Sequence, residues 1–283
     1  MKNLFPSYIK NRLSNKTKKK IFLFGGTGNY LFQIGHAIEL SKLNFDVVLF
    51  YLPQKLSFIW KFFGFTQQEI WINTHLIAEK NKLQIEKINF IDAVNVLTRY
   101  LLKKLNFNVN FDLPLCQQSF ISSKYVIGYF QSKSHQSYKT LEHLAKLISS
   151  ELNISKKLYM RNVIHFRAGD FDKASYIKKD VLKHIASEHE KIIFTTNDRK
   201  KVKKYCDSID LDYEINNSKS ALDDFKFMST SQRLYVSFST FSFWSALICK
   251  LNGGTVIFPF NESQLKVFNK NQGLIYLFKE FCE

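Results

Sequence analysis

The chain has 283 residues, of which 45% are hydrophobic, and it contains 28 phenylalanines but only 4 prolines. This composition excludes a disordered chain, and the length suits two α/β lobes of ordinary size. The formal net charge of +17 calls for an anionic neighbour, which is nucleic acid, anionic lipid or a phosphorylated ligand. The lysines are spread along the chain without a nucleic-acid-binding signature, so nucleic acid is the weaker interpretation.

The cysteines and the N-terminus bear on the compartment. The cysteines are isolated, with no CxxC pair and no histidine at ligand spacing: Cys116, Cys206, Cys249 and Cys282. Residues 1–20 are basic but lack the apolar core of a signal peptide, and no apolar run reaches the length of about 18 residues needed to span a bilayer. We expect a cytoplasmic protein, with peripheral contact of residues 2–20 with an anionic membrane as the alternative to a solvated terminus.

The first lobe opens with a β-α-β pattern. A strand is expected over residues 20–24, then a glycine-rich turn at 25–29, a helix with apolar residues at helical spacing, and a second strand over 46–52. Such glycines let backbone amides approach an anion at a helix start. The run is neither GxGxxG nor a P-loop, however, so by itself it also fits a plain tight turn.

The rest of the first lobe alternates in the same way. The aromatic cluster at 57–64 is interpreted as core rather than the wall of an acceptor groove. The remaining expected elements are a strand at 88–91, a helix at 93–105, a strand at 125–130 and an amphipathic helix at 138–152. A polar break at 153–157 follows, so we expect domains of residues 1–155 and 156–283.

The second lobe is expected to form a parallel sheet with helices on both faces. Its predicted strands cover 161–166, 191–196, 213–215, 234–237 and 255–258. Its predicted helices cover 178–188, 199–208, 221–229 with Ser220 as N-cap, a segment starting in 238–242, and most of 263–281. An alternative for the last of these helices is that it packs back on the first lobe.

A histidine and an arginine leave the strand at 161–166 together. His165 and Arg167 are two residues apart, so they share one face of an extended chain, and Gly169-Asp170 then signals a turn. Open α/β sheets bind ligands at the carboxyl ends of their strands, and the guanidinium fork suits phosphate. The alternative is that Arg167 pairs with Asp170 only to tie the loop.

Two further strands of this lobe end in polar loops, at Asn197-Asp198 and at Ser239–Ser242. The helix start at Ser239 and Thr240 suits a phosphate, and Asp198 can accept a hydrogen bond from a sugar hydroxyl or a base amino group. One ligand can touch all three strand ends. No carboxylate pair with metal spacing lies among them, so we expect no metal site.

Five segments, taken in order, resemble motifs of the bacterial α-1,2-fucosyltransferases of glycosyltransferase family 11. They are GGTGNYLFQ at 25–33, GYFQS at 128–132, HFRAGDF at 165–171, FTTND at 194–198 and STFSFWSA at 239–246. The chain departs from the family pattern at Tyr30, Ala168, Asn197 and Phe238. The first arginine of the third motif, here Arg167, is retained.

The resemblance implies a GT-B-type fold with two Rossmann-like lobes and a cleft between them, the second lobe holding GDP-fucose. It implies inverting, metal-independent transfer of L-fucose, or a related deoxyhexose such as colitose, to an oligosaccharide or lipid-linked glycan, with an α-1,2 linkage in surface polysaccharide or O-antigen synthesis. No cofactor and no nucleic acid are expected. The acceptor, the exact donor, the general base and the oligomeric state stay open.

The implied site combines both lobes. The catalytic residues are Arg167, His165 and Asp170, with Asp170 favoured to orient Arg167. The donor-binding residues are Gly25, Gly26, Gly28, Asn29, Gln33, Gly169, Asn197, Asp198, Ser239, Thr240, Phe241 and Ser242. The alternatives are a transferase of the same fold for another nucleotide sugar, and a non-catalytic basic protein that binds nucleic acid or membrane.

Overall fold

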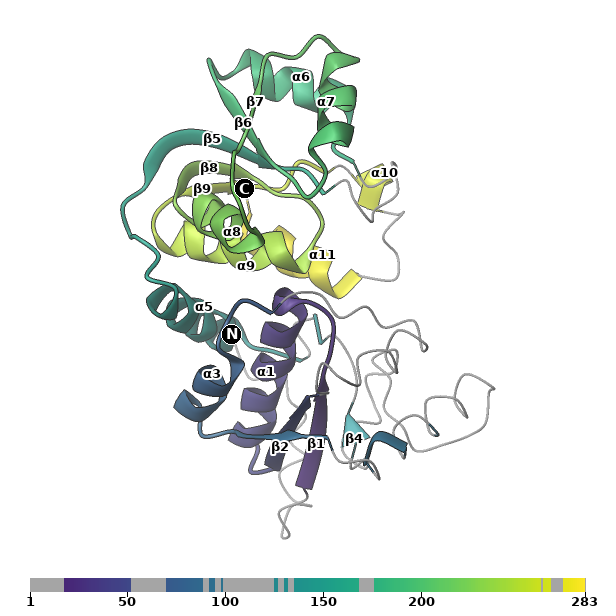
Figure 1. The fold of residues 1–283 in the computed structure, drawn as a ribbon, viewed down its shortest axis with the longest axis vertical. Helices are drawn as coiled ribbons and strands as arrows, with labels where there is room; N and C mark the ends of the chain where they lie inside the picture. The colour runs from purple at the N-terminus through teal and green to yellow at the C-terminus, as the bar shows by residue number, and fades with distance from the viewer. Residues whose placement is uncertain are drawn as a thin grey trace. The chain divides into compact units, whose positions relative to one another are not determined.

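The computed structural model describes residues 18–51, 70–88, 92–94, 98, 125–126, 130–131, 135–167, 176–260, 262–265 and 272–282. The chain divides into two compact units, Met1–Leu144 (unit 1) and Ala145–Glu283 (unit 2). Each unit is an α/β structure built on a parallel sheet (Figure 1). The division falls inside helix α5 (Tyr138–Glu151), and the predicted boundary between residues 155 and 156 lies beyond the end of that helix.

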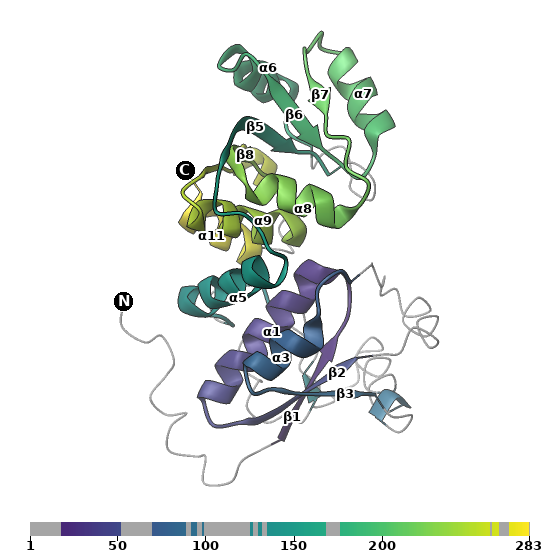
Figure 2. The same cartoon turned by 60° about the vertical axis from the view of Figure 1, so that its left-hand side comes forward.

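Unit 1 contains a parallel sheet with the strand order β3-β2-β1-β4. Its strands are β1 (Lys18–Leu23), β2 (Asp46–Tyr51), β3 (Gln84–Lys87) and β4 (Tyr125–Val126). Helix α1 (Thr27–Lys42) joins β1 to β2 and packs on both, while α3 (Thr74–Lys80) packs on β3 (Figure 2). This order, 3-2-1-4, is that of a Rossmann sheet, in which the strand order reverses between the first and fourth strands.

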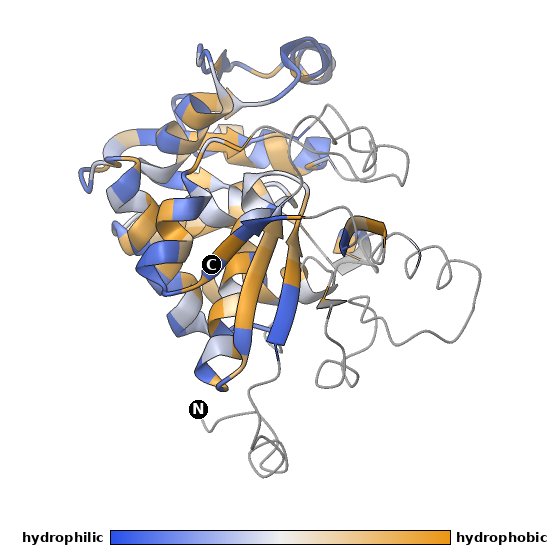
Figure 3. Cartoon of the chain, turned by 60° about the horizontal axis from the view of Figure 1, so that its bottom comes forward, coloured by the Kyte–Doolittle hydropathy of each residue, from blue (hydrophilic) through white to orange (hydrophobic). Residues whose placement is uncertain are grey.

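The core of unit 1 forms because most of β2 and the second half of β1 are apolar on both faces, as strands covered on two sides are. Ile21, Val48 and Leu49 are fully buried, and the apolar parts of β1 and β2 are orange in Figure 3. Helix α1 is buried along most of its length, with Leu31 and Phe32 among its enclosed residues. A helix that is buried on several sides needs a cover opposite the sheet.

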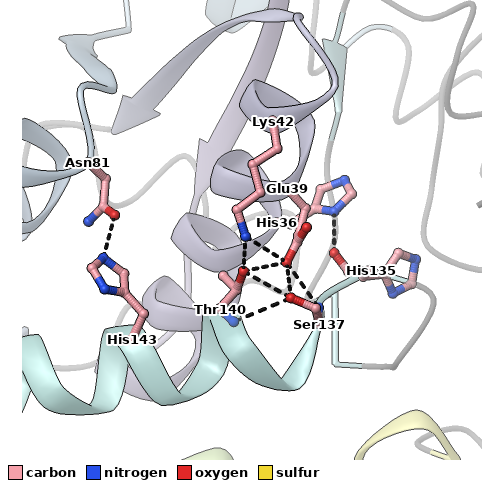
Figure 4. Close-up of polar contacts among 8 residues, drawn as sticks. All are labelled: His36, Glu39, Lys42, Asn81, His135, Ser137, Thr140 and His143. Carbon is pink, nitrogen blue, oxygen red and sulfur yellow. Dashed lines mark hydrogen bonds and ion pairs between the residues drawn. The ribbon is translucent and has the colours of Figure 1, made fainter. Parts of the chain in front are cut away.

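Helix α5 supplies part of that cover and is tied to α1 by a carboxylate (Figure 4). Glu39 accepts hydrogen bonds from the backbone nitrogen of Ser137 at 3.0 Å, from its hydroxyl at 2.6 Å, and from the hydroxyl of Thr140. Lys42 donates to the Thr140 hydroxyl at 2.6 Å and lies 3.4 Å from Glu39. A negative charge at the first turn of α5 complements the helix dipole.

Two buried histidines lie beside this tie. The Nδ1 atom of His36 is 3.1 Å from the carbonyl oxygen of His135, and the His36 ring stacks on Phe130 with centroids 4.2 Å apart. Burial lowers the pKa of His36 to about 3, helped by the neighbouring His135. Burial likewise lowers the pKa of His135 to about 4. Both rings are therefore neutral at pH 7.

Unit 2 contains a parallel sheet with the order β7-β6-β5-β8-β9, which is 3-2-1-4-5 counted within the unit. Its strands are β5 (Tyr159–His165), β6 (Ile192–Thr195), β7 (Glu214–Ile215), β8 (Ser231–Tyr235) and β9 (Thr255–Ile257). Helices α6 (Lys179–Ser187) and α7 (Arg199–Asp207) lie on one face of the sheet in Figure 1, and α8 (Ala221–Ser229) and α9 (Thr240–Leu251) lie on the other.

Aromatic side chains fill both faces of this sheet. Phe166 contacts the rings of Tyr176, Phe194 and Tyr205 at centroid distances of 4.8, 6.1 and 5.2 Å. On the other face, α9 is largely buried, and helix α11 (Gln272–Phe281) packs on it within unit 2, with the short helix α10 (Glu262–Leu265) preceding it. The option that the last helix packs on the first lobe stays a prediction.

The fold class is the predicted one: the chain is α/β, with two parallel sheets in Rossmann strand order. The cleft between the lobes stays a prediction. Most predicted elements of unit 2 are confirmed within a few residues, including the N-cap of α8, where the Ser220 hydroxyl accepts from Asp223 N at 3.1 Å.

The sequence interpretation was wrong at several strands. Strand β3 (Gln84–Lys87) was not predicted, because it is mostly exposed and its polar residues mask its pattern. Of the strand predicted at 88–91, Ile88 is outside a strand and the other residues lie outside the described part of the chain. The strand predicted at 234–237 covers Ser231–Tyr235, and helix α3 was not predicted. The strand predicted at 125–130 is described only as Tyr125–Val126, and Phe130 has a positive φ of 51°, outside strand geometry. Residues 57–64 and most of 93–105 lie outside the described part of the chain.

Candidate active site

The strongest candidate site lies where the strand order of unit 2 reverses, between β5 and β8. His165 is the last residue of β5, and Ser237 lies two residues beyond the end of β8. The two strands run parallel and side by side, with Ile164 opposite Tyr235, so their carboxyl ends meet at one edge of the sheet. Ligands of open α/β sheets bind in the crevice at this position.

His165 is held at this edge by a side-chain hydrogen bond. Its Nδ1 atom lies 2.7 Å from the hydroxyl oxygen of Ser237, and its ring lies 5.5 Å from the ring of Phe241. Burial, and to a smaller extent the positive charge of Arg167, lower the pKa of His165 to about 3. The imidazole is therefore neutral at pH 7, which leaves one donor and one acceptor on the ring.

The N-terminus of α9 begins directly after Ser237. The Ser239 hydroxyl caps the helix by accepting from Ser242 N at 3.1 Å, and the Ser242 hydroxyl donates to the carbonyl of Ser237 at 2.5 Å. Both hydroxyls are buried and shape the turn, whereas Thr240 and Phe241 are partly exposed on the first turn. The positive end of the helix dipole favours an anion here.

The end of β6 forms the next part of the edge. Thr195 pairs with His165 in the sheet, and its buried hydroxyl has no hydrogen-bond partner among the described residues. Asn197 is exposed, and Asp198 caps α7 by accepting from Lys201 N at 3.0 Å. Asp198 thus has a structural role at the helix start, and its contact with a sugar or base stays a prediction.

The structure therefore brings together part of the predicted catalytic set. Half-buried Arg167 lies close enough to His165 for its positive charge to lower the pKa of the His165 ring. Gly169 and Asp170 lie outside the described residues, so the orienting role of Asp170 stays a prediction.

The predicted donor-binding residues of unit 1 form a well-tied turn. Gly25 has a φ of 87°, a backbone conformation that favours glycine, and Gly26 is the N-cap of α1, with Gly28 in its first turn. The Gln33 amide is fully buried, accepting from the backbone nitrogen of Phe24 at 3.1 Å and donating to its carbonyl at 3.3 Å.

Asn29 also forms a hydrogen bond within unit 1. Its Oδ1 atom accepts from Nε2 of Gln131 at 3.0 Å, which links the β1–α1 turn to the segment that follows β4. Both amides thus hold the turn in place. The assignment of Asn29 and Gln33 to donor binding stays a prediction.

Comparison with known proteins identifies the family. The family model of glycosyl transferase family 11 matches residues 121–277, which is more than half of the chain and includes all of the unit 2 site. The chain belongs to glycosyl transferase family 11. No curated protein matches the sequence.

Several solved structures are similar to this family 11 chain over most of its length. The E. coli heptosyltransferase WaaC with ADP-2-deoxy-2-fluoro heptose is 8% identical and covers 90% of this chain and 99% of its own, with a TM-score of 0.34. POFUT1 in complex with GDP is 10% identical, with coverage of 83% and 95% and a TM-score of 0.35. The glycosyl transferase family 9 protein from Veillonella parvula is 12% identical, with coverage of 86% and 81% and a TM-score of 0.39.

The described residues show neither a metal cluster nor a membrane-spanning helix. Among these residues, no three His, Cys, Asp or Glu side chains are grouped to hold a metal ion, and Asp170 is not among them. No helix in the described part of the chain is long and apolar enough to cross a membrane. The expectations of a metal-independent reaction and of peripheral membrane contact stay predictions.

One residue of the family 11 site escaped the sequence analysis. Ser237 was included only as the end of a predicted strand, yet its hydroxyl holds His165. The signal that identifies it is the strand order, because only a 3-2-1-4 sheet places the residues after β8 next to the end of β5.

Proposed function

We propose that this family 11 glycosyltransferase moves L-fucose, or a related deoxyhexose, from its GDP donor to a hydroxyl of a glycan acceptor. The observation that carries the proposal is the pairing of His165 with Ser237 at the reversal point of a Rossmann-ordered sheet, next to Arg167 and the start of α9. These groups suit a diphosphate: Arg167 offers a charged fork, and the helix start offers backbone amides.

The chemistry follows from the leaving group. As the bond between the sugar and the diphosphate breaks, negative charge develops on the diphosphate, and preoriented donors lower the barrier by stabilising that charge. Arg167 supplies a permanent positive charge, and neutral His165 supplies a hydrogen bond. Transfer with inversion needs a base for the acceptor hydroxyl, and Asp170 is available for that role or for orienting Arg167.

The first test is calorimetric titration of the full chain with GDP, UDP and ADP. We expect GDP to bind most tightly, and absence of GDP binding at millimolar nucleotide would contradict the proposal. A preference for UDP or ADP would instead favour a transferase of the same fold that uses another nucleotide sugar.

The second test is transfer itself, measured with labelled GDP-fucose and a panel of galactoside and lipid-linked acceptors. We expect an α-1,2-linked product with a surface-glycan precursor. Turnover should persist in EDTA, since charged and backbone donors take the place of a metal at the diphosphate. Complete loss on chelation, restored by Mg²⁺ or Mn²⁺, would contradict the metal-independent mechanism.

A further inference from the structure

The hydrogen bond between Ser237 and His165 has a direction that the surroundings determine. Both residues are 4% exposed, and the two atoms are 2.7 Å apart. A neutral imidazole carries its proton on either Nδ1 or Nε2, and the proton's position decides which atom donates to a ligand.

The hydroxyl of Ser237 has one proton to donate. Among the described residues its Oγ atom has a single hydrogen-bond partner, Nδ1 of His165. If Nδ1 carried the ring proton, it would donate to Oγ and leave the buried hydroxyl proton without an acceptor, which is unfavourable. The favoured arrangement therefore has Ser237 donating to an unprotonated Nδ1.

The backbone fixes where this hydroxyl lies. The carbonyl of Ser237 accepts hydrogen bonds from Ser239 N at 2.9 Å and from the Ser242 hydroxyl at 2.5 Å. Ser237 is thus anchored to the first turn of α9, and through it the imidazole is anchored as well. The bond links the ends of two neighbouring strands to the helix start.

The remaining ring nitrogen of His165 is Nε2. Nε2 of His165 has no hydrogen-bond partner among the described residues, and it is not one of the buried side-chain atoms that lack both a partner and contact with solvent. With Nδ1 occupied, Nε2 carries the proton. An N–H at this position attracts an anionic oxygen, whereas a bare nitrogen lone pair would repel it.

We propose that Ser237 is a positioning residue that holds His165 as the Nε2–H tautomer, so that the ring donates a hydrogen bond to an oxygen of the nucleoside diphosphate. This inference rests on the proposed function for its ligand, but the tautomer is a property of the protein alone. Ser237 itself does not contact the diphosphate.

The tautomer can be measured without any ligand. In untagged protein labelled with ¹⁵N-histidine, the ring nitrogens of His165 are assigned by their loss in the His165→Gln variant. We expect an unprotonated Nδ1 and a protonated Nε2 in the native protein and in Ser237→Thr, which keeps the hydroxyl. Ser237→Ala should show a mixture of tautomers. A protonated Nδ1 in the native protein would overturn the proposal.

The effect on the ligand is measured by a double-mutant cycle of GDP affinity. Ser237→Ala should weaken GDP binding about tenfold, the scale of one neutral hydrogen bond, and Ser237→Thr should restore most of it. In the His165→Ala background, Ser237→Ala should have no further effect. An equal loss in both backgrounds would overturn the positioning role.

A failure of the proposed function can be distinguished from a failure of the tautomer assignment. If the native protein binds no GDP, the proposed function fails and the ligand named here fails with it. The nitrogen spectrum still decides the tautomer in that case, because it is recorded on the free protein.

Discussion

The two units share a strand order but use their polar side chains differently. In unit 1 the Asn29–Gln131 hydrogen bond joins the start of α1 to the segment after β4, and in unit 2 the His165–Ser237 hydrogen bond joins the end of β5 to the segment after β8. In unit 1 the amide of Gln33 is fully engaged with the backbone. In unit 2, Nε2 of His165 has no hydrogen-bond partner among the described residues. The same edge of a Rossmann sheet thus serves as a scaffold in one unit and as a candidate for chemistry in the other.

The largest expected difference between the units is in how much stability each loses at acidic pH. A histidine with a lowered pKa stays neutral when folded, while the unfolded chain takes up a proton below pH 6.5. Stability is therefore complete above pH 6.5 and falls as the pH drops toward the folded pKa of about 3 for His36, about 4 for His135 and about 3 for His165.

Between pH 7.5 and pH 5 each of these groups should cost about 2 kcal/mol of unfolding free energy, which gives about 4 kcal/mol in unit 1 and about 2 kcal/mol in unit 2. Urea unfolding at several pH values measures the loss. In His36→Asn, which keeps a donor near the Nδ1 position, the loss should shrink by about 2 kcal/mol. An unchanged pH dependence in that variant would contradict the role of His36.

The second prediction concerns chemistry in unit 2. Arg167→Ala should reduce kcat at least about a hundredfold, since one well-placed donor to developing charge is worth about 3 kcal/mol. Arg167→Lys should recover little of this loss, because lysine lacks the planar fork. Steady-state kinetics with GDP-fucose, together with urea unfolding, separate the effect from stability. Near-normal turnover in folded Arg167→Ala would mean that the loop is structural.

The third prediction tests the scaffold role in unit 1. Gln33→Met fills similar volume but removes the hydrogen bonds of the Gln33 amide with the backbone nitrogen and carbonyl of Phe24. We expect a loss of about 2 kcal/mol in unfolding free energy and little change in GDP affinity per folded molecule. Gln131→Ala is the control. It removes the hydrogen bond to Asn29, but the Gln131 side chain is only partly buried, so the loss of unfolding free energy should be smaller than in Gln33→Met. Weaker GDP binding at unchanged stability would show that Gln33 contacts the donor.

Local patterns predicted much of unit 2, since buried parallel strands give clear apolar runs and polar residues mark where they end. The cap at Ser220 was readable from the sequence alone, because hydroxyls at helix starts have one common use. Strand β3 was not predicted, because an edge strand that is mostly exposed lacks that apolar run.

The site was harder to predict than the fold. The pair formed by His165 and Ser237 spans 72 positions in the sequence and depends on which strands are neighbours, which no local pattern contains. Gln33 lies in a glycine-rich motif that indicates a ligand site, but the motif cannot distinguish a residue that contacts the ligand from one that holds the turn. Only the hydrogen bonds of its amide to Phe24 make that distinction.

The smallest expected effect comes from an ion pair of unit 2. Lys191 lies 2.7 Å from Glu214, but the two side chains are 60% and 57% exposed. Water screens such a pair, so Lys191→Ala should change unfolding free energy by less than about 0.5 kcal/mol, with a further decrease of the effect in high salt.

The matched change in unit 1 is Lys20→Met, at a pair 2.6 Å apart whose side chains are 13% and 6% exposed. There the loss should reach about 3 kcal/mol, because Asp92 would stay buried without its lysine. Equal losses in the two variants would mean that burial does not separate these pairs.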